Sequence, residues 1–382
     1  MKKIALMILI AALLASTVSA YAVEPVGEDI LQVTAPSAVL MEKTSGSVLY
    51  EKNSHERLAP ASVTKVMTLL LIMEEIAAGN IAYKDQVTCS SYAASMGGSQ
   101  IWLEENEKMT VGDMVKAIAV VSANDCAVAM AERIAGSESA FVTRMNERAE
   151  QLGMADTHFM DCTGLTDDDN HYTSAYDIAL MSRELLFHED IKDYTTIWMD
   201  SLRGGESALT NTNKLVRFFD GATGLKTGFT KKAMYCLSAS AMRDGTEYIA
   251  VVMHEQTSAE RFESAKALLS YGFANFELCS LRAPEALPPV AVELGETNSL
   301  QPEYSGQAGM LVEKGAAKDL SYEIVLPESL VAPIDKGARL GEVIVRSGDE
   351  ELTRVPLLAG SAVERLTTFK IYGKLLLKLF GK

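Results

Sequence analysis

Apolar and polar residues alternate over residues 36–52, on both sides of a polar turn at 44–47, and this pattern predicts a β-hairpin. From Ser62 to Ala78 the apolar positions instead recur every three or four residues, so we expect a helix between Pro60 and Gly79. The same helical spacing returns over three later segments: Val111–Ile134, Glu138–Leu152 and Ser174–Leu186.

Strand-like runs return later in the chain. Residues Met234–Ser240 and Tyr248–Met253 flank an Asp244-Gly245 turn, which predicts a second hairpin, and a helix over Ser258–Leu269 follows. With strands at both ends and helices between them, we expect an α+β domain over residues 30–278. Its antiparallel sheet would pair the first and last strands beside a layer of helices.

The composition changes at a proline-rich stretch, residues 283–289. Short alternating runs separated by turn residues follow it: Val290–Leu294, Ala308–Val312, Tyr322–Leu326, Glu342–Val345 and Thr353–Leu357. This spacing is typical of a small all-β domain, which we expect over residues 284–360.

Both ends of the chain differ from this body. Residues 1–22 combine two lysines, an apolar run and Ala20-Tyr21-Ala22, which predicts a cleaved export signal. Residues 361–382 carry Arg365 and four lysines, and on a helical wheel the lysines lie opposite most of the large apolar side chains. We therefore expect an amphipathic helix on an anionic membrane surface. The exported protein would be peripheral, at the outer face of the cytoplasmic membrane.

Net charge excludes one class of partner. The chain has 51 acidic residues against 35 basic ones, a formal charge of −16, and such an acidic body repels nucleic acid. The five cysteines are widely spaced and odd in number, which predicts small buried residues and not a disulfide scaffold. Cys126 and Cys236 each lie close to a motif described below, so we expect them to line the same site.

The first candidate chemistry lies at the start of the helix that begins at Ser62. Ser62 and Lys65 are one helical turn apart, so both side chains can reach the same point. A serine hydroxyl needs a base to act as a nucleophile, and a lysine serves if burial or nearby positive charge lowers its pKa. Taken alone the pair is a weak signal, because most Ser-x-x-Lys sequences are capped or solvated helix starts.

A second motif, Ser122-Ala123-Asn124, lies inside an apolar helical region, where buried polar side chains need partners. We expect Ser122 to pass a proton between Lys65 and a leaving amine. We expect Asn124 to hold Lys65 and a substrate carbonyl group.

A third motif, Lys226-Thr227-Gly228, comes just before the late hairpin. Lys226 and Thr227 are suited to binding a carboxylate. Gly228 lets a substrate backbone approach the strand, because glycine has no side chain to block it.

Ser-x-x-Lys, a Ser-x-Asn triplet and Lys-Thr-Gly together are a signature of class A β-lactamases and penicillin-binding proteins. The chain resembles the low-molecular-mass penicillin-binding proteins, the serine D-alanyl-D-alanine carboxypeptidases, over nearly its whole length. The resemblance also rests on these stretches: Leu58–Lys65, Gly153-Met154, Thr157-His158-Phe159, Thr163-Gly164-Leu165, His171–Asp177 and Tyr271-Gly272-Phe273. It implies a serine β-lactamase/DD-peptidase-like domain, and members of the family also carry a β-rich domain and an amphipathic tail.

The resemblance implies a mechanism. Ser62 would attack the peptide bond between the two D-alanines of a peptidoglycan pentapeptide, with Lys65 as base and Ser122 relaying a proton to the departing D-alanine. The backbone N–H groups of Ser62 and Phe229 would form the oxyanion hole. β-Lactams would acylate Ser62 and leave slowly. No cofactor is implied.

The resemblance assigns Lys226, Thr227 and Arg261 to the terminal carboxylate of the substrate. The chain also departs from the family pattern at three positions: Phe229 where many relatives have His, Thr223 where they often have Asp, and Ala123 where many have Gly. The oxyanion role of Phe229 is a backbone one, so we expect this difference to change the rate and not to abolish activity.

A metal site is a weaker hypothesis. His158 and His171 lie near Asp161 and Cys162 in the sequence, but no H-E-x-x-H or paired-cysteine spacing accompanies them. The resemblance places both histidines in a loop that borders the site, so we expect no metal.

Three alternatives stay open. A serine β-lactamase shares the three motifs, but the Glu-x-x-Leu-Asn pattern of class A enzymes does not occur between Asn124 and Lys226. A DD-endopeptidase would use the same chemistry on cross-links. An inactive, membrane-bound adaptor of the cell envelope is the non-enzymatic alternative, against which the intact motifs argue.

Overall fold

The computed structural model describes residues 31–306, 309–368 and 370. The predicted export signal, residues 1–22, and most of the predicted tail helix lie outside the described residues. The chain divides into two compact units, with the division between Phe276 and Glu277.

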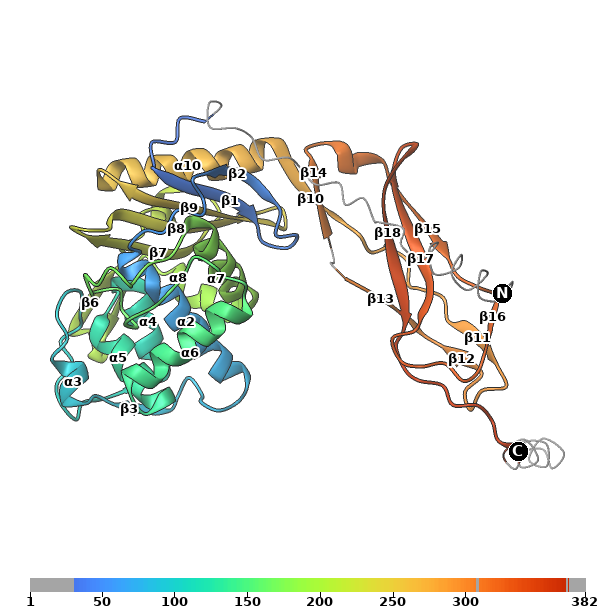
Figure 1. Ribbon diagram of the computed structural model, residues 1–382, viewed down its shortest axis with the longest axis horizontal. Coiled ribbons are helices and arrows are strands. Elements are labelled where there is room, and N and C mark those ends of the chain that lie inside the picture. Colours follow the sequence, from blue (N-terminus) through green and yellow to red (C-terminus); the bar gives the residue numbers. More distant parts are fainter. Residues whose placement is uncertain (1–30, 307–308, 369, 371–382) are drawn as a thin grey trace, which may run out of the picture. The chain divides into compact units, whose positions relative to one another are not determined.

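The first unit is built on a five-stranded antiparallel sheet in the order β2-β1-β9-β8-β7 (Figure 1). Its strands are β1 Ser37–Glu42, β2 Val48–Lys52, β7 Ala222–Thr230, β8 Met234–Arg243 and β9 Thr246–Glu255. The first strand pairs with the last, so the predicted α+β arrangement is confirmed. β9 is buried along almost its whole length because helices cover both faces of the sheet, which explains its nearly unbroken apolar sequence.

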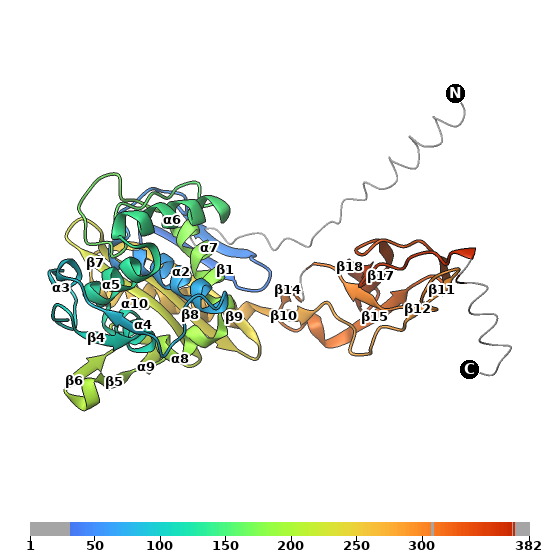
Figure 2. The same cartoon turned by 90° about the horizontal axis from the view of Figure 1, so that it is seen from below.

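One helix, α10 (Ser258–Asn275), lies along one face of the sheet, and most of the other helices pack against the opposite face (Figures 1 and 2). The helix α2 (Lys65–Ala77) runs through that second layer, and nine of its residues, Lys65–Met73, are buried in succession. The remaining helices of the unit are α3 Ser91–Ala94, α4 Val111–Val121, α5 Asn124–Ala135, α6 Glu138–Gln151, α7 Ala175–Phe187, α8 Lys192–Thr195 and α9 Leu215–Phe218.

Two short hairpins escaped the sequence analysis. They pair β3 Gln86–Thr88 with β4 Lys108–Thr110, and β5 Met199–Leu202 with β6 Ser207–Thr210. Strands of three or four residues are too short for an alternating pattern to stand out.

Two predicted helices differ from the observed ones. The helix expected over Val111–Ile134 is two helices, because Ser122 adopts a left-handed backbone conformation with φ of +65° and ends α4. The helix expected from Ser62 begins instead with a 3-10 turn, η1 (Ala61–Thr64), that leads directly into α2. Both irregularities fall on candidate catalytic residues.

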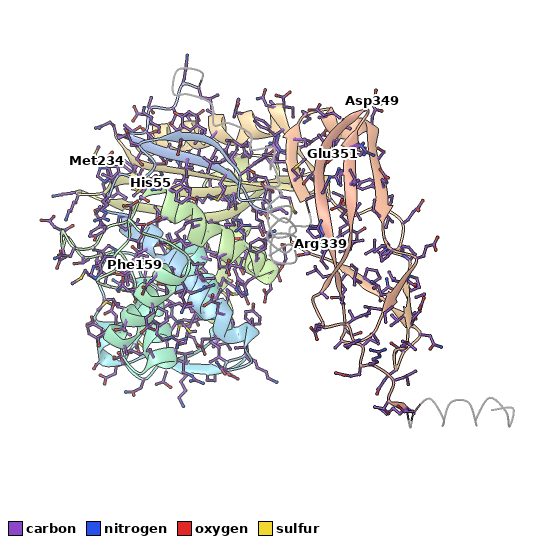
Figure 3. The ribbon with its side chains drawn as sticks, turned by 45° about the vertical axis from the view of Figure 1, so that its right-hand side comes forward. His55, Phe159, Met234, Arg339, Asp349 and Glu351 are labelled. Carbon is purple, nitrogen blue, oxygen red and sulfur yellow. The ribbon has the colours of Figure 1, made fainter. Side chains whose placement is uncertain are left out.

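The second unit is rich in β-strands, as predicted. It contains a four-stranded sheet in the order β13-β18-β17-β15, a three-stranded sheet in the order β12-β11-β16, and a pairing of β10 with β14. The strands are β10 Phe276–Ser280, β11 Val290–Glu293, β12 Ser299–Leu300, β13 Pro302–Tyr304, β14 Gly309–Glu313, β15 Leu320–Val325, β16 Ser329–Val331, β17 Arg339–Ser347 and β18 Glu350–Ala359. Asp349 and Glu351 lie at the turn of the long β17–β18 hairpin, and Arg339 lies at its other end (Figure 3).

The residue predicted to start the tail helix is wrong. We expected a helix from residue 361, but Val363 is buried and its backbone pairs with Ile334, while Arg365 pairs with Gly295. Helical geometry begins only at Thr368. Val363 packs into the apolar cluster of the β-rich unit, and this burial holds the segment extended. Among the described residues, no helix has the length and apolar character needed to cross a membrane.

Candidate active site

Ser62 and Lys65 meet where the 3-10 turn η1 becomes α2. Lys65 Nζ donates to Ser62 Oγ at 3.0 Å and to the carbonyl oxygen of Thr163 at 2.7 Å. Lys65 is completely buried, and burial lowers its pKa from 10.5 to about 8, although nearby acidic groups such as Asp161 oppose the shift. The half-buried Ser62 therefore contacts an amine that loses its proton close to neutral pH, as an activated nucleophile requires.

Ser122 and Asn124 lie at the break between α4 and α5. Both side chains are buried, and Ser122 Oγ and Asn124 Oδ1 have no hydrogen-bond partner among the described residues. Buried polar atoms without partners are rare, so a substrate is a natural partner for these two. The amide of Asn124 donates to the carbonyl of Gly97 at 2.7 Å and holds that loop, whereas we had expected it to hold Lys65.

Asp125, which the sequence analysis overlooked, fixes the same loop more firmly. Its buried carboxylate accepts hydrogen bonds from the backbone N–H groups of Ile101 at 3.1 Å and Leu103 at 3.0 Å. Its position directly after the Ser-x-Asn triplet was the available signal, because a buried acid must find donors.

Lys226 and Thr227 lie on β7, the edge strand of the sheet. Lys226 is buried and donates to the carbonyl oxygen of Thr227 at 2.8 Å. Burial lowers its pKa well below the usual value, and the positive charges of Lys65 and Arg261 lower it further. Thr227 Oγ1 donates to Thr212 Oγ1 at 2.7 Å. Such a cluster of desolvated cations favours an anionic ligand.

Gly228 brings β7 against the 3-10 turn η1, which carries Ser62 and is called the nucleophile turn below. A Cβ atom on Gly228 would lie 2.7 Å from the carbonyl oxygen of Pro60 and 3.1 Å from Val63, so only glycine fits. The close approach that we had expected for a substrate backbone is thus made by the protein itself. The next residue, Phe229, is 52% exposed, and its ring packs on Tyr235 with centroids 4.4 Å apart.

Arg261 reaches β7 from α10. A capping box, formed by Thr257 and Glu260, starts this helix immediately before it. The buried guanidinium donates through Nη1 to the carbonyl oxygens of Gly228 at 3.1 Å and Cys236 at 3.4 Å, and burial lowers its pKa to about 10. These bonds hold the end of β7. The predicted role of Arg261 in binding a substrate carboxylate stays a prediction.

The loop over residues 160–171 completes the site, although the sequence analysis gave its residues no role in catalysis. Asp161 accepts hydrogen bonds from the backbone N–H groups of Thr163 and Gly164, and the carbonyl of Thr163 accepts one from Lys65. The polar turn sequence Asp161-Cys162-Thr163-Gly164 was the available signal, because Asp commonly accepts from backbone groups two or three residues on. Figure 3 shows the neighbouring Phe159 among the helices and Met234 at the outer end of the sheet.

Histidines and cysteines show no metal-binding arrangement in the part of the chain that the structure describes. His158 Nδ1 pairs with the carbonyl oxygen of Asn170 at 2.8 Å, and His171 uses both ring nitrogens in hydrogen bonds. All five cysteines are free and buried, as predicted. Cys236 Sγ lies 3.9 Å from the carbonyl oxygen of Ala59, beside the nucleophile turn.

The fold and these contacts are those of a serine hydrolase in which a buried lysine contacts the serine. Residues 22–257 match the family model described as D-alanyl-D-alanine carboxypeptidase (peptidase S11), and residues 289–365 match the C-terminal domain of penicillin-binding protein 5. The first match covers more than half of the chain, which therefore belongs to the D-alanyl-D-alanine carboxypeptidase family, among the low-molecular-mass penicillin-binding proteins.

Relatives support this membership over most of the chain. The D-alanyl-D-alanine carboxypeptidase DacF of Bacillus subtilis is 44% identical over 85% of both chains, and DacA of Escherichia coli is 31% identical over 90% of this chain and 87% of its own. The crystal structure of penicillin-binding protein 5 from Haemophilus influenzae has 30% identity and a TM-score of 0.74, and covers 89% of this chain and 100% of its own. Penicillin-binding protein D2 of Listeria monocytogenes, in an ampicillin-bound form, covers 64% of this chain and all of its own with a TM-score of 0.57 and 29% identity.

Proposed function

We propose that this enzyme removes the terminal D-alanine from peptidoglycan pentapeptide stems through an acyl-enzyme on Ser62. One observation carries the proposal: a buried lysine, Lys65, with a pKa lowered to about 8, donates a hydrogen bond to the Ser62 hydroxyl. The relatives are named as D-alanyl-D-alanine carboxypeptidases, and family membership supports the same activity here.

Acylation follows from this geometry. Neutral Lys65 takes the proton of Ser62 as Oγ attacks the carbonyl carbon of the penultimate D-alanine. The backbone N–H groups of Ser62 and Phe229 stabilise the oxyanion. The tetrahedral intermediate then collapses, the C–N bond breaks, and the Ser122 hydroxyl delivers a proton to the departing amine and recovers one from Lys65. Water attacks the remaining ester, with Lys65 again as base, and frees Ser62.

Substrate orientation is assigned to β7 and its neighbours. Lys226 and Thr227 bind the terminal carboxylate, and Arg261 supports them through its bonds to β7. The sequence predicted that Asn124 holds a substrate carbonyl group, but its Nδ2 donates to Gly97. Its unpartnered Oδ1 is instead suited to accept from a substrate backbone N–H group. β-Lactams enter the same site and acylate Ser62, in keeping with the ampicillin-bound form of the Listeria relative.

The remaining expectations concern the parts around the catalytic domain. We propose an export signal over residues 1–22, a catalytic domain over 30–278, a β-rich domain over 284–360 and a membrane-binding tail within 361–382, now with its helix starting at Thr368. The enzyme would then act at the outer face of the cytoplasmic membrane. If protein that lacks residues 368–382 sediments with anionic vesicles as well as the full mature chain does, the tail is not the anchor.

The deciding experiment measures D-alanine release from a diacyl-lysyl-D-alanyl-D-alanine peptide by the mature protein and by Ser62→Ala. We expect release by the wild type and none by the variant. Equal release by both proteins would remove Ser62 from the mechanism. Covalent penicillin labelling of the wild type without D-alanine release would instead favour an endopeptidase or an adaptor, and rapid turnover of penicillin would favour a β-lactamase.

A further inference from the structure

His171 has a buried ring with both nitrogens in hydrogen bonds. Nδ1 accepts from the backbone N–H of Met160 at 3.0 Å, so this nitrogen carries no proton. Nε2 must then carry the proton, and it donates to Thr64 Oγ1 at 2.8 Å. Burial, the largest influence, lowers the pKa of His171 below its usual 6.5, which agrees with a neutral ring.

The hydrogen-bond chain continues into the nucleophile turn. Because Thr64 Oγ1 accepts a hydrogen bond from His171, the Thr64 hydroxyl can donate its own proton. It donates to the carbonyl oxygen of Ala61, with 2.8 Å between the two oxygens. Thr64 is completely buried, so water does not compete for this hydroxyl. The direction of each bond is therefore set by the tautomer of His171.

This series of hydrogen bonds ends at Ala61, a residue with a strained backbone. Ala61 has φ of +48°, a left-handed conformation that costs a non-glycine residue roughly 1–2 kcal/mol. Its carbonyl belongs to the peptide unit that leads into Ser62. A strained conformation persists only where its surroundings hold it, and the Thr64 hydroxyl is the side chain that holds this carbonyl.

The loop that carries His171 also positions Lys65. The carbonyl oxygen of Thr163 accepts from Lys65 Nζ at 2.7 Å, and Gly164 packs directly against the carbonyl of Ala61. One loop thus sets the base through Thr163 and the nucleophile turn through His171 and Thr64. Nucleophilic catalysis depends on the mutual geometry of these two groups.

We propose that His171 is a positioning residue for acylation, which acts through Thr64 and the Ala61 carbonyl to orient Ser62 toward Lys65. The inference rests on the proposed function of the same site. The hydrogen bonds of His171 go to Thr64 and Met160 and not to Ser62 or Lys65, so we assign it no part in proton transfer. The same two hydrogen bonds argue against a metal-binding role for this imidazole, because they already engage both ring nitrogens.

The test compares variants that keep or lose the hydrogen bonds. His171→Leu removes both bonds, whereas His171→Gln keeps one donor and one acceptor on a neutral side chain. Thr64→Val removes the hydroxyl at constant shape, and Thr64→Ser restores it. The readout is the second-order rate of Ser62 acylation by a fluorescent penicillin, measured on the full mature chain together with its thermal unfolding midpoint.

We expect His171→Leu and Thr64→Val each to slow acylation at least about tenfold, because small misplacements of reacting groups carry large rate penalties. His171→Gln and Thr64→Ser should recover most of the rate. The double variant His171→Leu/Thr64→Val should be no slower than the slower single variant, since both changes break one chain of bonds.

Thr157→Val is the matched control. Thr157 Oγ1 hydrogen-bonds Asp177 and Thr173, each at 2.7 Å, so its loss destabilises the neighbouring segment without touching the turn at 61–65. We expect this variant to unfold at a lower temperature and yet to acylate at the wild-type rate. If it slows acylation as much as His171→Leu does, His171 has only a structural role and the proposal is overturned.

Two other results would overturn the proposal: wild-type acylation by folded His171→Leu, or multiplied rate losses in the double variant. If His171→Leu does not fold, His171→Ala takes its place under the same two expectations, and the Thr64→Val and Thr64→Ser pair tests the step from Thr64 to Ala61. Penicillin acylation reports on Ser62 whether or not D-alanine is released. A wild type that labels but releases no D-alanine would therefore sink the proposed function and leave the role of His171 to be decided by the labelling rates.

Discussion

Replacing Gly164 by alanine tests how tightly the nucleophile turn is held. Gly164 has φ of +74°, and a Cβ atom built on it would lie 1.8 Å from the carbonyl oxygen of Ala61 and 2.7 Å from Thr64 Oγ1. Cβ atoms essentially never come within 3.0 Å of a neighbouring atom, and the nearest atom here is rigid backbone. The loop and the turn must therefore separate by more than about 1 Å, which is enough to disrupt a catalytic alignment.

The expected magnitude follows from two contributions. A left-handed alanine costs roughly 1–2 kcal/mol, and overpacking a buried contact adds about 1–3 kcal/mol. Gly153→Ala supplies the control, because Gly153 has nearly the same φ, +73°, and a Cβ atom there meets nothing within 4 Å. We expect a loss of about 2–5 kcal/mol in the free energy of unfolding for Gly164→Ala and about 1–2 kcal/mol for Gly153→Ala.

Urea unfolding and penicillin acylation measure the two effects separately. We expect Gly164→Ala to acylate about 100-fold more slowly than wild type while folded, because Ser62 moves with Ala61. Gly153→Ala should acylate normally. If the two variants match each other in both stability and acylation rate, the contact between Gly164 and Ala61 does not set the position of the nucleophile, and the reasoning is refuted.

Three further predictions follow from single groups. Acylation should rise with pH and level off above about pH 8, because the pKa of Lys65 is lowered to about 8 and only the neutral amine accepts the Ser62 proton; a flat profile between pH 6 and 9 would contradict this. Ser122→Ala should lower D-alanine release by roughly 100-fold or more. The same change should leave the free energy of unfolding equal or raise it by about 1 kcal/mol, because Ser122 Oγ is buried without a partner among the described residues; a clear loss of stability by urea unfolding would show an unseen partner. Glu247→Gln should cost about 1–3 kcal/mol in urea unfolding, since this buried carboxylate lies 3.1 Å from Lys43 Nζ and 2.9 Å from Lys192 Nζ, while both lysines keep Glu189 as a partner; no measurable loss would mean that the ion cluster adds little.

The sequence predicted the α+β sheet because burial on both faces leaves nearly continuous apolar runs, as in β9, and turns such as Asp244-Gly245 mark the hairpins. It predicted one helix over 111–134 because apolar spacing does not register a single residue with positive φ, and Ser122 is such a residue. It placed the tail helix seven residues early because the amphipathic pattern of 361–367 looks the same whether Val363 faces a membrane or a protein core.

The sequence predicted the parts of the candidate site in which side chains carry the chemistry. It did not predict the parts that are formed by backbone groups. Ser62, Lys65 and Lys226 stood out as motif residues, but the acceptor for Lys65 is the carbonyl of Thr163, which no residue type specifies. Thr223 stands where many relatives have Asp, and the sequence alone gave no consequence for this difference. Its hydroxyl donates to Glu247 at 2.7 Å, so β9, which lies beyond β8 in the sheet, supplies the carboxylate that this position lacks.

The charges of the site suit an anionic substrate, as the proposed function requires. Burial lowers the pKa values of both Lys65 and Lys226, but Asp161 and Asp125 partly restore that of Lys65, whereas Lys65 and Arg261 lower that of Lys226 further. A carboxylate beside Lys226 supplies the missing opposite charge, so binding an anionic substrate favours the protonated form of this lysine. The carboxylate and a positive Lys226 then offset each other's charge at Lys65, so burial remains the main reason why Lys65 can reach the neutral form that the proposed mechanism requires.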